Sequence, residues 1–356
     1  MEAVVLVGGQ GTRLQPLTLR TPKPMLPCAG APFLAHQLTR LRDSGIDHIV
    51  LATSYRSEVF HEYFGNGKDL GVRIDFVTET EPLGTAGGIR NVVRRLESGP
   101  EDPVVILNGD ILSGHDIRAQ LELHRRREAA VTLHLVEVED PRAFGCVPTD
   151  SHARVTGFIE KSDAPVTNRI NAGCYVFTRK VIDGIPEGRP VSVERETFPG
   201  LLEVGETMLG YVDTAYWIDV GTPVAFVTAN ADIVTGVLTS PAMPGAPGEA
   251  LVMDDALVHS GAVVNGGSTI GPRARVDAGA QVTRSVIGDG VHVQAGATVV
   301  DSLVGRRAVI GQRSVVSSAV IGEGATVGAN NELAVGIRIW NEAAVPDGAI
   351  RFSSLP

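Results

Sequence analysis

Cysteines, aromatic residues and long apolar runs are all scarce in this sequence. Its 356 residues include three cysteines, an odd number without the spacing of metal ligands, so neither a disulfide framework nor a zinc site is expected. No apolar run approaches the length of a membrane-spanning helix and no signal peptide is expected before the first strand, so no membrane partner is expected. We interpret the cysteines as reduced thiols and predict a cytoplasmic protein.

Basic charge is also in short supply. The 41 Asp and Glu residues outnumber the 31 Lys and Arg residues, which gives a net charge of −10. Proteins that bind nucleic acids usually carry a basic stripe, so nucleic acid is not an expected partner. An acidic chain can still bind phosphates through one local basic loop. Hydrophobic residues make up 43% of the chain, which is enough for a large core. The chain of 356 residues is also long enough for two domains.

The segment 1–240 alternates between strand and helix patterns. The apolar run at 2–7 ends in glycines and predicts a buried strand, while helical spacing of apolar residues at 33–42 predicts the first helix. Further strands are expected at 48–53, 72–78 and 103–107, and further helices at 57–64, 85–96 and 226–237. The strands become denser after Val131, which indicates a mixed sheet. The pattern therefore predicts a Rossmann-like, doubly wound α/β fold.

The rest of the chain follows a different pattern. A segment rich in Pro, Gly and Ala at 241–250 predicts a linker between a domain at 1–240 and another at 251–356. The segments 280–296, 297–313 and 314–330 align as three consecutive units of equal length, with aliphatic side chains at steps of five or six positions. This repeat predicts a three-sided β-solenoid, whose coils stack into one continuous core. Ordinary antiparallel strands would not explain the fixed register.

A glycine-rich loop follows the first strand and predicts a phosphate site. In Gly8-Gly9-Gln10-Gly11-Thr12-Arg13 the glycines let backbone N–H groups converge on an anion, and Arg13 and Lys23 add positive charge. The dinucleotide motif needs a third glycine where Leu14 stands, and the Gly-Lys-Ser/Thr of the P-loop is absent. Taken alone, the loop is also compatible with a simple turn beside a surface arginine.

The loop and several later segments resemble the sugar nucleotidyltransferase family. In the loop the resemblance runs from Gly8 to Thr18 and from Pro22 to Met25. The later segments are Glu81 to Gly87, Asn108 to Asp110, Phe158 to Lys161, Ile170 to Gly173, and Trp217 to Pro223. The match is strongest to the mannose-1-phosphate guanylyltransferases that carry a C-terminal left-handed β-helix. It implies a nucleotidyltransferase fold followed by a left-handed parallel β-helix, with GTP and mannose 1-phosphate as substrates and Mg²⁺ as cofactor.

Two acids are candidate metal ligands. Asp110 follows a buried strand, where α/β folds bind ligands, and Asp219 lies between Trp217 and Gly221. From the pattern alone, Asp110 could instead cap the next helix and Asp219 could form a turn. The resemblance assigns both acids to one Mg²⁺, an ion that prefers hard oxygen ligands and accompanies phosphates.

The resemblance also implies the substrate contacts. Arg13 and Lys23 are the expected catalytic residues, with Arg13 on the β- and γ-phosphates and Lys23 on the α-phosphate or the sugar phosphate. The expected nucleotide-binding residues are Leu6, Gly8, Gly9, Gly11, Thr12, Glu79, Pro82, Gly84 and Thr85. The expected sugar-phosphate residues are Gly109, Gly145, Glu160, Lys161 and Asn171. Without the resemblance, Glu160 and Lys161 are interpreted as an exposed strand end and Gly145 as a bulge glycine.

Glu79 favours guanine as the base on physical grounds. Guanine offers two adjacent donors, N1–H and N2–H₂, and one carboxylate can accept from both. Uracil and thymine offer one donor flanked by acceptor oxygens, which a carboxylate would repel. Glu79 or Glu81 could also be a solvated loop acid.

Other functions remain open at this point. The same chemistry serves glucose-1-phosphate thymidylyl or adenylyl transfer and heptose-phosphate guanylyl transfer. A catalytically silent regulatory subunit is a further alternative. The residues expected to carry the chemistry, Arg13, Lys23, Asp110 and Asp219, are however all present. Acyl transfer by the solenoid would need a histidine at a cleft between chains, and His259 and His292 are interpreted as solvated turn residues. We interpret the solenoid as a regulatory module or as the interface of a homo-oligomer.

Overall fold

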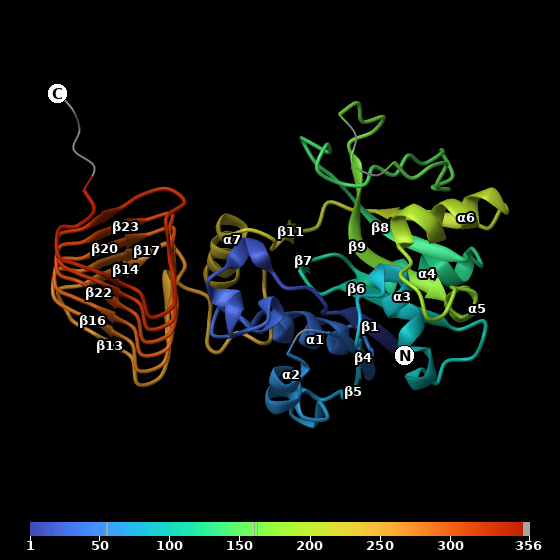
Figure 1. The fold of residues 1–356 in the computed structure, drawn as a ribbon. Helices are drawn as coiled ribbons and strands as arrows, with labels where there is room; N and C mark the ends of the chain where they lie inside the picture. Colours follow the sequence, from blue (N-terminus) through green and yellow to red (C-terminus); the bar gives the residue numbers. More distant parts are fainter. Residues whose placement is uncertain (55, 160, 162, 352–356) are drawn as a thin grey trace. The chain divides into compact units, whose positions relative to one another are not determined.

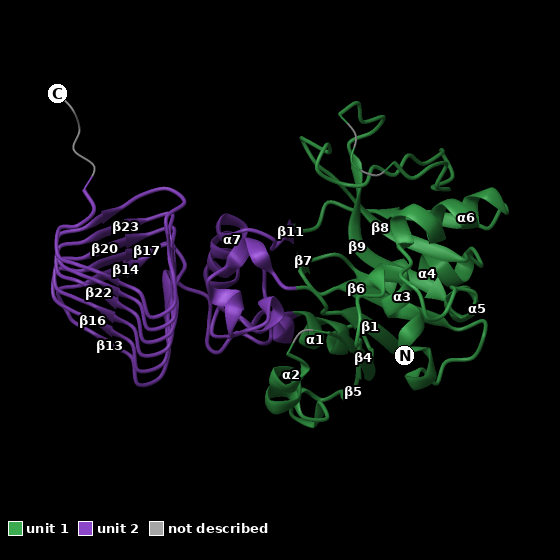
Figure 2. Cartoon of the chain, in the orientation of Figure 1, with its two compact units in different colours: residues 1–9, 37–217 green, residues 10–36, 218–356 purple. Residues whose placement is uncertain are grey.

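The computed structural model describes residues 1–54, 56–159, 161 and 163–351 (Figure 1). The chain folds as two compact units (Figure 2). The first unit combines residues 1–9 with 37–217, and the second combines residues 10–36 with 218–356. Within the described residues, no helix is both long enough and apolar enough to cross a membrane.

A seven-stranded mixed sheet organises the first unit. Its strands are β1 (Glu2–Leu6), β4 (His48–Thr53), β5 (Arg73–Thr78), β6 (Pro103–Asn108), β8 (Val131–Glu137), β9 (Arg169–Thr178) and β10 (Met208–Val212). They lie in the order β10-β8-β9-β6-β1-β4-β5. Strand β9 runs antiparallel to its neighbours, β6 and β8, and the other pairs are parallel. The predicted Rossmann-like mixed sheet is therefore confirmed.

Helices pack on this sheet around an apolar core. They are α1 (Phe33–Asp43), α2 (Ser57–Phe64), α3 (Gly84–Asn91), α4 (Ile117–Arg126), α5 (Arg179–Asp183) and α6 (Phe198–Glu203). Short elements are η4 (Lys68–Leu70), η5 (Val93–Arg95), the π-turn η6 (Val193–Thr197), β7 (Ile111–Ser113) and β11 (Trp217–Asp219). The helix expected to reach residue 96 ends at Asn91, where a pair of β-branched valines begins.

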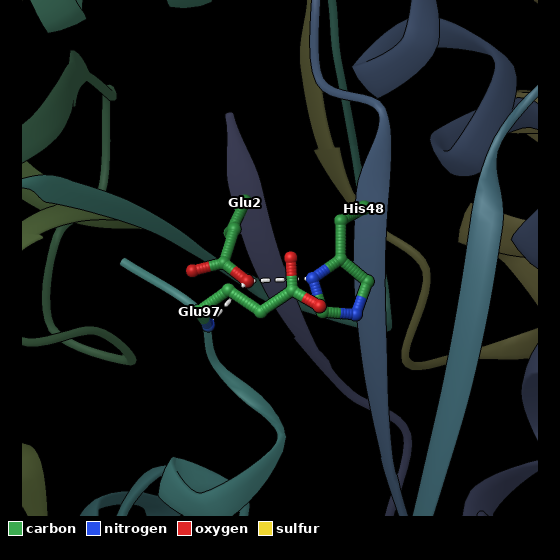
Figure 3. A group of neighbouring side chains, drawn as sticks. All are labelled: Glu2, His48 and Glu97. Carbon is green, nitrogen blue, oxygen red and sulfur yellow. Dashed lines mark hydrogen bonds and ion pairs between the residues drawn. The ribbon is translucent and has the colours of Figure 1, made fainter. Parts of the chain in front are cut away.

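A polar network lies at the amino-terminal ends of strands β1 and β4 (Figure 3). Glu2 accepts hydrogen bonds from His48 Nδ1 at 2.6 Å and from the backbone of Glu97 and Ser98 at 2.8 and 2.7 Å. His48 also contacts Asp75 through Nε2, at 3.0 Å. Ligand atoms of Glu2, His48 and Glu97 lie within 4.8 Å of one another, but hydrogen bonds already engage Glu2 and His48. We therefore interpret the group as a structural network rather than a metal site.

The charge of Glu2 stabilises this edge of the sheet. Burial alone would raise the pKa of its carboxyl, but hydrogen bonds from Glu97, Ser98 and His48 outweigh burial and lower that pKa below its ordinary value of 4.5. A lowered pKa means that the stabilisation is present above pH 4.5 and is lost as the pH falls through the lowered value.

The second unit begins with the segment after Gly9. It forms three short 3₁₀ turns, η1 (Thr12–Leu14), η2 (Leu17–Leu19) and η3 (Lys23–Met25), and a small hairpin of β2 (Pro27–Cys28) and β3 (Ala31–Pro32). The long helix α7 (Pro223–Thr235) follows β11. These elements fill the stretch between the first strand and α1.

One buried asparagine of α7 joins the hairpin to the C-terminal region. Asn230 is 1% exposed, and its Oδ1 accepts from Ala29 N and from Thr269 Oγ1, both at 2.8 Å. Its Nδ2 donates to Gly267 O at 2.9 Å. Because these side-chain polar atoms are satisfied away from water, the network fixes the hairpin, helix and first coil together.

The C-terminal region is a three-sided parallel β-helix, as predicted. One sheet contains β12 (Ala250–Val252), β15 (Ser268–Ile270), β18 (Val286–Ile287), β21 (Leu303–Val304), β24 (Val320–Ile321) and β27 (Arg338–Ile339). A second contains β13 (Leu257–Val258), β16 (Arg275–Val276), β19 (His292–Val293), β22 (Val309–Ile310), β25 (Thr326–Val327) and β28 (Ala344–Val345). The third contains β14 (Val263–Asn265), β17 (Gln281–Thr283), β20 (Thr298–Val300), β23 (Val315–Ser317) and β26 (Glu332–Leu333).

The sequence repeat is visible in the strand register. Val282 pairs with Val299, and Val299 with Val316, so equivalent aliphatic side chains stack in one buried column. The first coil is slightly longer, since Val264 pairs with Val282. Its corner uses two left-handed glycines, at Gly266 and Gly267, whereas the next coil turns with a single left-handed residue. The predicted stacked core is confirmed, and Figure 1 shows its coils in succession from orange to red.

Candidate active site

The carboxyl ends of three strands meet beside the glycine-rich loop. Leu6 at the end of β1 pairs with Ala52 of β4 and with Asn108 of β6. The chain order reverses between β1 and β6, and the crevice at such a point is where open α/β sheets bind ligands. Gly109 N donates to Leu6 O at 2.8 Å, so the segment carrying Asp110 is held against the start of the loop.

Gly8 and Gly9 follow this end of β1, and both are exposed. Gly9 has φ of +115°, a value that side chains rarely permit, and its N–H donates to Ser54 Oγ at 3.4 Å. A Cβ at Gly8 would lie 3.1 Å from the same oxygen. The glycines are therefore required by conformation and space, as expected of a backbone that approaches an anion. Ser54 was not among the site residues predicted from the sequence. The sequence signal that could have indicated it is a polar residue directly after a buried strand.

The second half of the loop folds on itself. Gly11 has φ of +59°, and Thr12 begins η1 directly after it. The Gly11 carbonyl accepts from Leu14 N and from the buried Thr18 hydroxyl, both at 2.9 Å. A Cβ at Gly11 would lie 3.0 Å from Lys23 Cβ. The structure therefore brings the stem of Lys23 beside the loop, as the phosphate-site prediction requires.

Arg13 and Asp219 come together around Gly221. A Cβ at Gly221 would lie 2.5 Å from Arg13 Nη2 and 3.0 Å from Asp219 Oδ1. Only glycine leaves room for both groups. Asp219 is the last residue of β11, and Thr222, not Asp219, caps α7 by accepting from Ala225 N. A guanidinium and a carboxylate are thus placed at one turn, which suits a site for phosphate and a cation.

Asp110 does not cap the following helix. That role belongs to Asp116, whose side chain accepts from Ala119 N at 3.0 Å. Asp110 instead occupies the half-buried turn between β6 and β7. The possibility that Asp110 caps a helix is therefore excluded. Asp110 belongs to the first unit and Asp219 to the second.

Glu79 lies against α3 beside the first strand. A Cβ at Gly88 would meet Glu79 Oε1 at 2.7 Å and Leu6 Cδ2 at 3.6 Å, so these two expected nucleotide-binding residues are neighbours. Glu79 Oε2 accepts from Leu83 N at 3.4 Å. Burial raises the pKa of the Glu79 carboxyl, and the hydrogen bond from Leu83 opposes that rise. A partly desolvated carboxylate gains more from new donors than a hydrated one does.

The segment after Glu79 is fixed by the first turn of α3. Gly84 has φ of +70° and little space, since a Cβ there would lie 2.7 Å from Val191 O. Thr85 Oγ1 donates to Glu194 and accepts from Val193 N at 2.9 Å. Pro82 is exposed, next to these fixed residues. The predicted base-binding segment is therefore an ordered turn with one exposed edge.

Three of the expected sugar-phosphate residues, Gly145, Lys161 and Asn171, lie in β9 or in the connection between β8 and β9. Asn171 Nδ2 donates to Tyr175 Oη at 2.8 Å, and Asn171 N donates to Gly145 O at 2.9 Å. Gly173, with φ of +74°, allows Asn108 to lie close by. Lys161 is exposed and has φ of +33°. Glu160 lies outside the described residues. The contact of Asn171 with Tyr175 could not be predicted, because a buried aromatic residue in a strand is typical of a core.

The fold and these sequence segments define a class of enzyme. The nucleotidyl transferase family model matches residues 2–236, and the model described as the GMPPB C-terminal domain matches residues 246–346. The chain also resembles the crystal structure of HddC from Yersinia pseudotuberculosis complexed with GMP-PN, with a TM-score of 0.55 and 28% identity. That alignment covers 65% of this chain and 99% of HddC. This chain belongs to the nucleotidyl transferase family.

Curated relatives narrow the class. The chain is 55% identical to mannose-1-phosphate guanylyltransferase of Mycobacterium tuberculosis, over 99% of this chain and 98% of the relative. It is 39% identical to the mannose-1-phosphate guanylyltransferase catalytic subunit beta of Drosophila pseudoobscura pseudoobscura, over 73% of this chain and 71% of that one. Similarity along almost the whole chain indicates a sugar-1-phosphate nucleotidyltransferase.

Proposed function

We propose that this enzyme transfers the guanylyl group of GTP to mannose 1-phosphate, giving GDP-mannose and pyrophosphate. The similarity over the whole chain to a mannose-1-phosphate guanylyltransferase is the observation that carries the proposal. Glu79 beside Leu6 supports guanine, because its partly buried carboxylate can accept from the two adjacent donors of that base.

The reaction needs little covalent participation by the protein. An oxygen of the sugar phosphate attacks the α-phosphorus of GTP, the new P–O bond forms, and the bond to the β-phosphate oxygen breaks. The attacking oxygen is already anionic, so no general base is needed. Catalysis then consists of positioning and charge stabilisation. Arg13 neutralises the leaving pyrophosphate, and Lys23 holds the α-phosphate or the sugar phosphate.

The donor set fits a divalent cation, and we propose Mg²⁺. Asp110 and Asp219 both offer carboxylate oxygens, the ligands that this ion prefers. Asp110 lies in the turn between β6 and β7, and Asp219 ends β11. The guanidinium of Arg13, which would bind a phosphate, lies beside Gly221 in the turn that follows β11. When bound, Mg²⁺ would stabilise negative charge on the phosphates. Asp110 and Asp219 would hold it.

The direct test measures pyrophosphate release with a panel of nucleoside triphosphates and sugar 1-phosphates in the presence of Mg²⁺. We expect GTP with mannose 1-phosphate to give the highest kcat/KM. Higher turnover with another pair would reassign the base or the sugar on the same chemistry. No turnover with any pair would favour a regulatory subunit and overturn the proposal.

Replacing Glu79 by glutamine should reduce the preference for GTP. Glutamine keeps the size of the side chain but replaces one acceptor oxygen with a donor, which faces a donor of guanine. A hydrogen bond to a charged group contributes about 1.5–3 kcal/mol, so kcat/KM for GTP should fall about 10- to 100-fold relative to UTP and dTTP. Competition among the three nucleotides measures the ratio.

Glu81→Gln is the matched control for this change. Glu81 is an exposed acid in the same segment. The control should keep the wild-type ratio between GTP and the pyrimidine nucleotides. If Glu79→Gln also keeps that ratio, the assignment of Glu79 to the base is wrong.

We further propose that the β-helix joins copies of the chain into a homo-oligomer in the cytoplasm. Its surface carries exposed apolar side chains, among them Val335 at 85%, Leu257 at 67% and Trp340 at 50% exposure. The three cysteines are buried and free, which suits a reducing compartment.

Light scattering of the wild-type chain should give a mass of at least a dimer. The double substitution Leu257→Asp and Trp340→Asp should reduce that mass. A monomeric wild-type chain would refute the assembly role.

A further inference from the structure

The β-helix holds the backbone of the catalytic loop through one arginine. Arg338 begins β27, the last strand of its sheet. Its Nη2 donates to the carbonyl of Arg13 and its Nη1 to the carbonyl of Gln15, each at 2.8 Å. Residues 10–36 and the β-helix belong to the same compact unit, coloured purple in Figure 2. The contact therefore joins segments near opposite ends of the chain within one unit.

The geometry of this contact suits the end of a short helix. Thr12–Leu14 forms a single 3₁₀ turn, and carbonyls at the end of a helix lack partners within it. A planar guanidinium presents several N–H groups in a fixed fork, so one arginine can satisfy two such carbonyls at once. Arg338 therefore fixes both the position and the orientation of this turn.

The consequence falls on the side chain of Arg13. Its carbonyl accepts from Arg338, while its guanidinium lies beside Gly221, the glycine that Asp219 also approaches. The backbone of the residue is thus held by the last part of the β-helix, and its tip lies beside the turn after β11. A shift of the backbone would move the guanidinium relative to a bound triphosphate.

A second tether lies a few residues along the same segment. Arg20 pairs with Glu342 at 2.8 Å and approaches Glu323 at 4.0 Å. Glu323 also accepts from Arg306 and Arg307, so the pair belongs to a small charged network on the β-helix. Arg20 and Glu342 are exposed, and exposed ion pairs contribute little by themselves. The two bonds of Arg338 to backbone carbonyls are the more directional tether.

We propose that Arg338 is a positioning residue for the reaction, through which the β-helix holds Arg13 in place for the departing pyrophosphate. This role rests on the proposed function of Arg13. The β-helix then contributes to turnover within a single chain, in addition to any part in assembly. Arg338 itself touches no substrate in this proposal and acts only through the loop.

The test compares Arg338→Ala with wild type in the pyrophosphate-release assay. We expect kcat to fall between about 10- and 100-fold, because small displacements of a charged catalytic group are costly, with a smaller change in KM for mannose 1-phosphate. Arg338→Lys should recover part of kcat, since it retains one donor to the loop. Arg313→Ala is the control, because Arg313 bonds Asn330 within the β-helix.

A double-mutant cycle with Arg13→Ala separates positioning from general destabilisation. If Arg338 acts through Arg13, Arg338→Ala should have little further effect on kcat once Arg13 is already alanine. Equal losses in both backgrounds, or an Arg338→Ala chain with wild-type kcat, would overturn the inference while leaving the proposed function intact. Absence of turnover in the wild-type chain would instead refute the proposed function. Circular dichroism and thermal unfolding check that each variant is folded.

Discussion

Asp110→Asn and Asp219→Asn should each lower kcat by at least about 10³-fold at millimolar Mg²⁺. A bound metal contributes several kcal/mol of charge stabilisation, and a factor of ten in rate corresponds to about 1.4 kcal/mol. Asparagine keeps the size of the side chain but loses the negative charge that binds the cation. The remaining activity should require a higher Mg²⁺ concentration for half-saturation, which a Mg²⁺ titration of initial rates measures.

Asp116→Asn is the matched control for Asp110. Asp116 caps α4, the next helix along the chain, and asparagine is an equally good cap, so activity and the Mg²⁺ requirement should stay unchanged. Binding of GTP by calorimetry, with and without Mg²⁺, supplies a second readout. If either variant of the expected ligands shows wild-type half-saturation by Mg²⁺, that acid does not bind the ion.

Most of the fold could be predicted because its signals are local. Strands β4 and β6 appear as short apolar runs between turn residues, and the β-helix repeats its aliphatic positions once in every coil. The glycines of the loop could also be interpreted, since Gly9 and Gly11 adopt conformations that other residues rarely adopt. The family resemblance then indicated roles for the site residues that the local sequence pattern alone did not decide.

Contacts between distant segments could not be predicted. Nothing in the sequence distinguishes Arg338 from the other exposed basic residues, because its partners are backbone carbonyls near the opposite end of the chain. Asn230 likewise looks like an ordinary polar residue on a helix, and only the folded chain shows it bonded to both Ala29 and Gly267. The structure also decided between alternatives: Asp110 is not a helix cap, because Asp116 fills that position.

Arg13→Ala should lower kcat by about 10²- to 10³-fold, the usual effect of losing one donor that stabilises developing charge. Negative charge develops on the oxygen that bridged the α- and β-phosphates as the pyrophosphate leaves, so the loss should fall mainly on kcat. Arg13→Lys should recover part of the rate, because lysine keeps the charge but lacks the planar fork. Single-turnover measurements of GDP-mannose formation isolate this step from product release.

The control for Arg13 is Arg94→Ala, which removes an arginine whose side chain is 86% exposed and changes the net charge equally. It should leave kcat unchanged, so that any loss in Arg13→Ala reflects position rather than charge number. Gly221→Ala tests the same site from the other side, because its Cβ would displace the Arg13 guanidinium. Its kcat should fall like that of Arg13→Ala. Unchanged turnover in both variants would mean that Arg13 does not stabilise the leaving group.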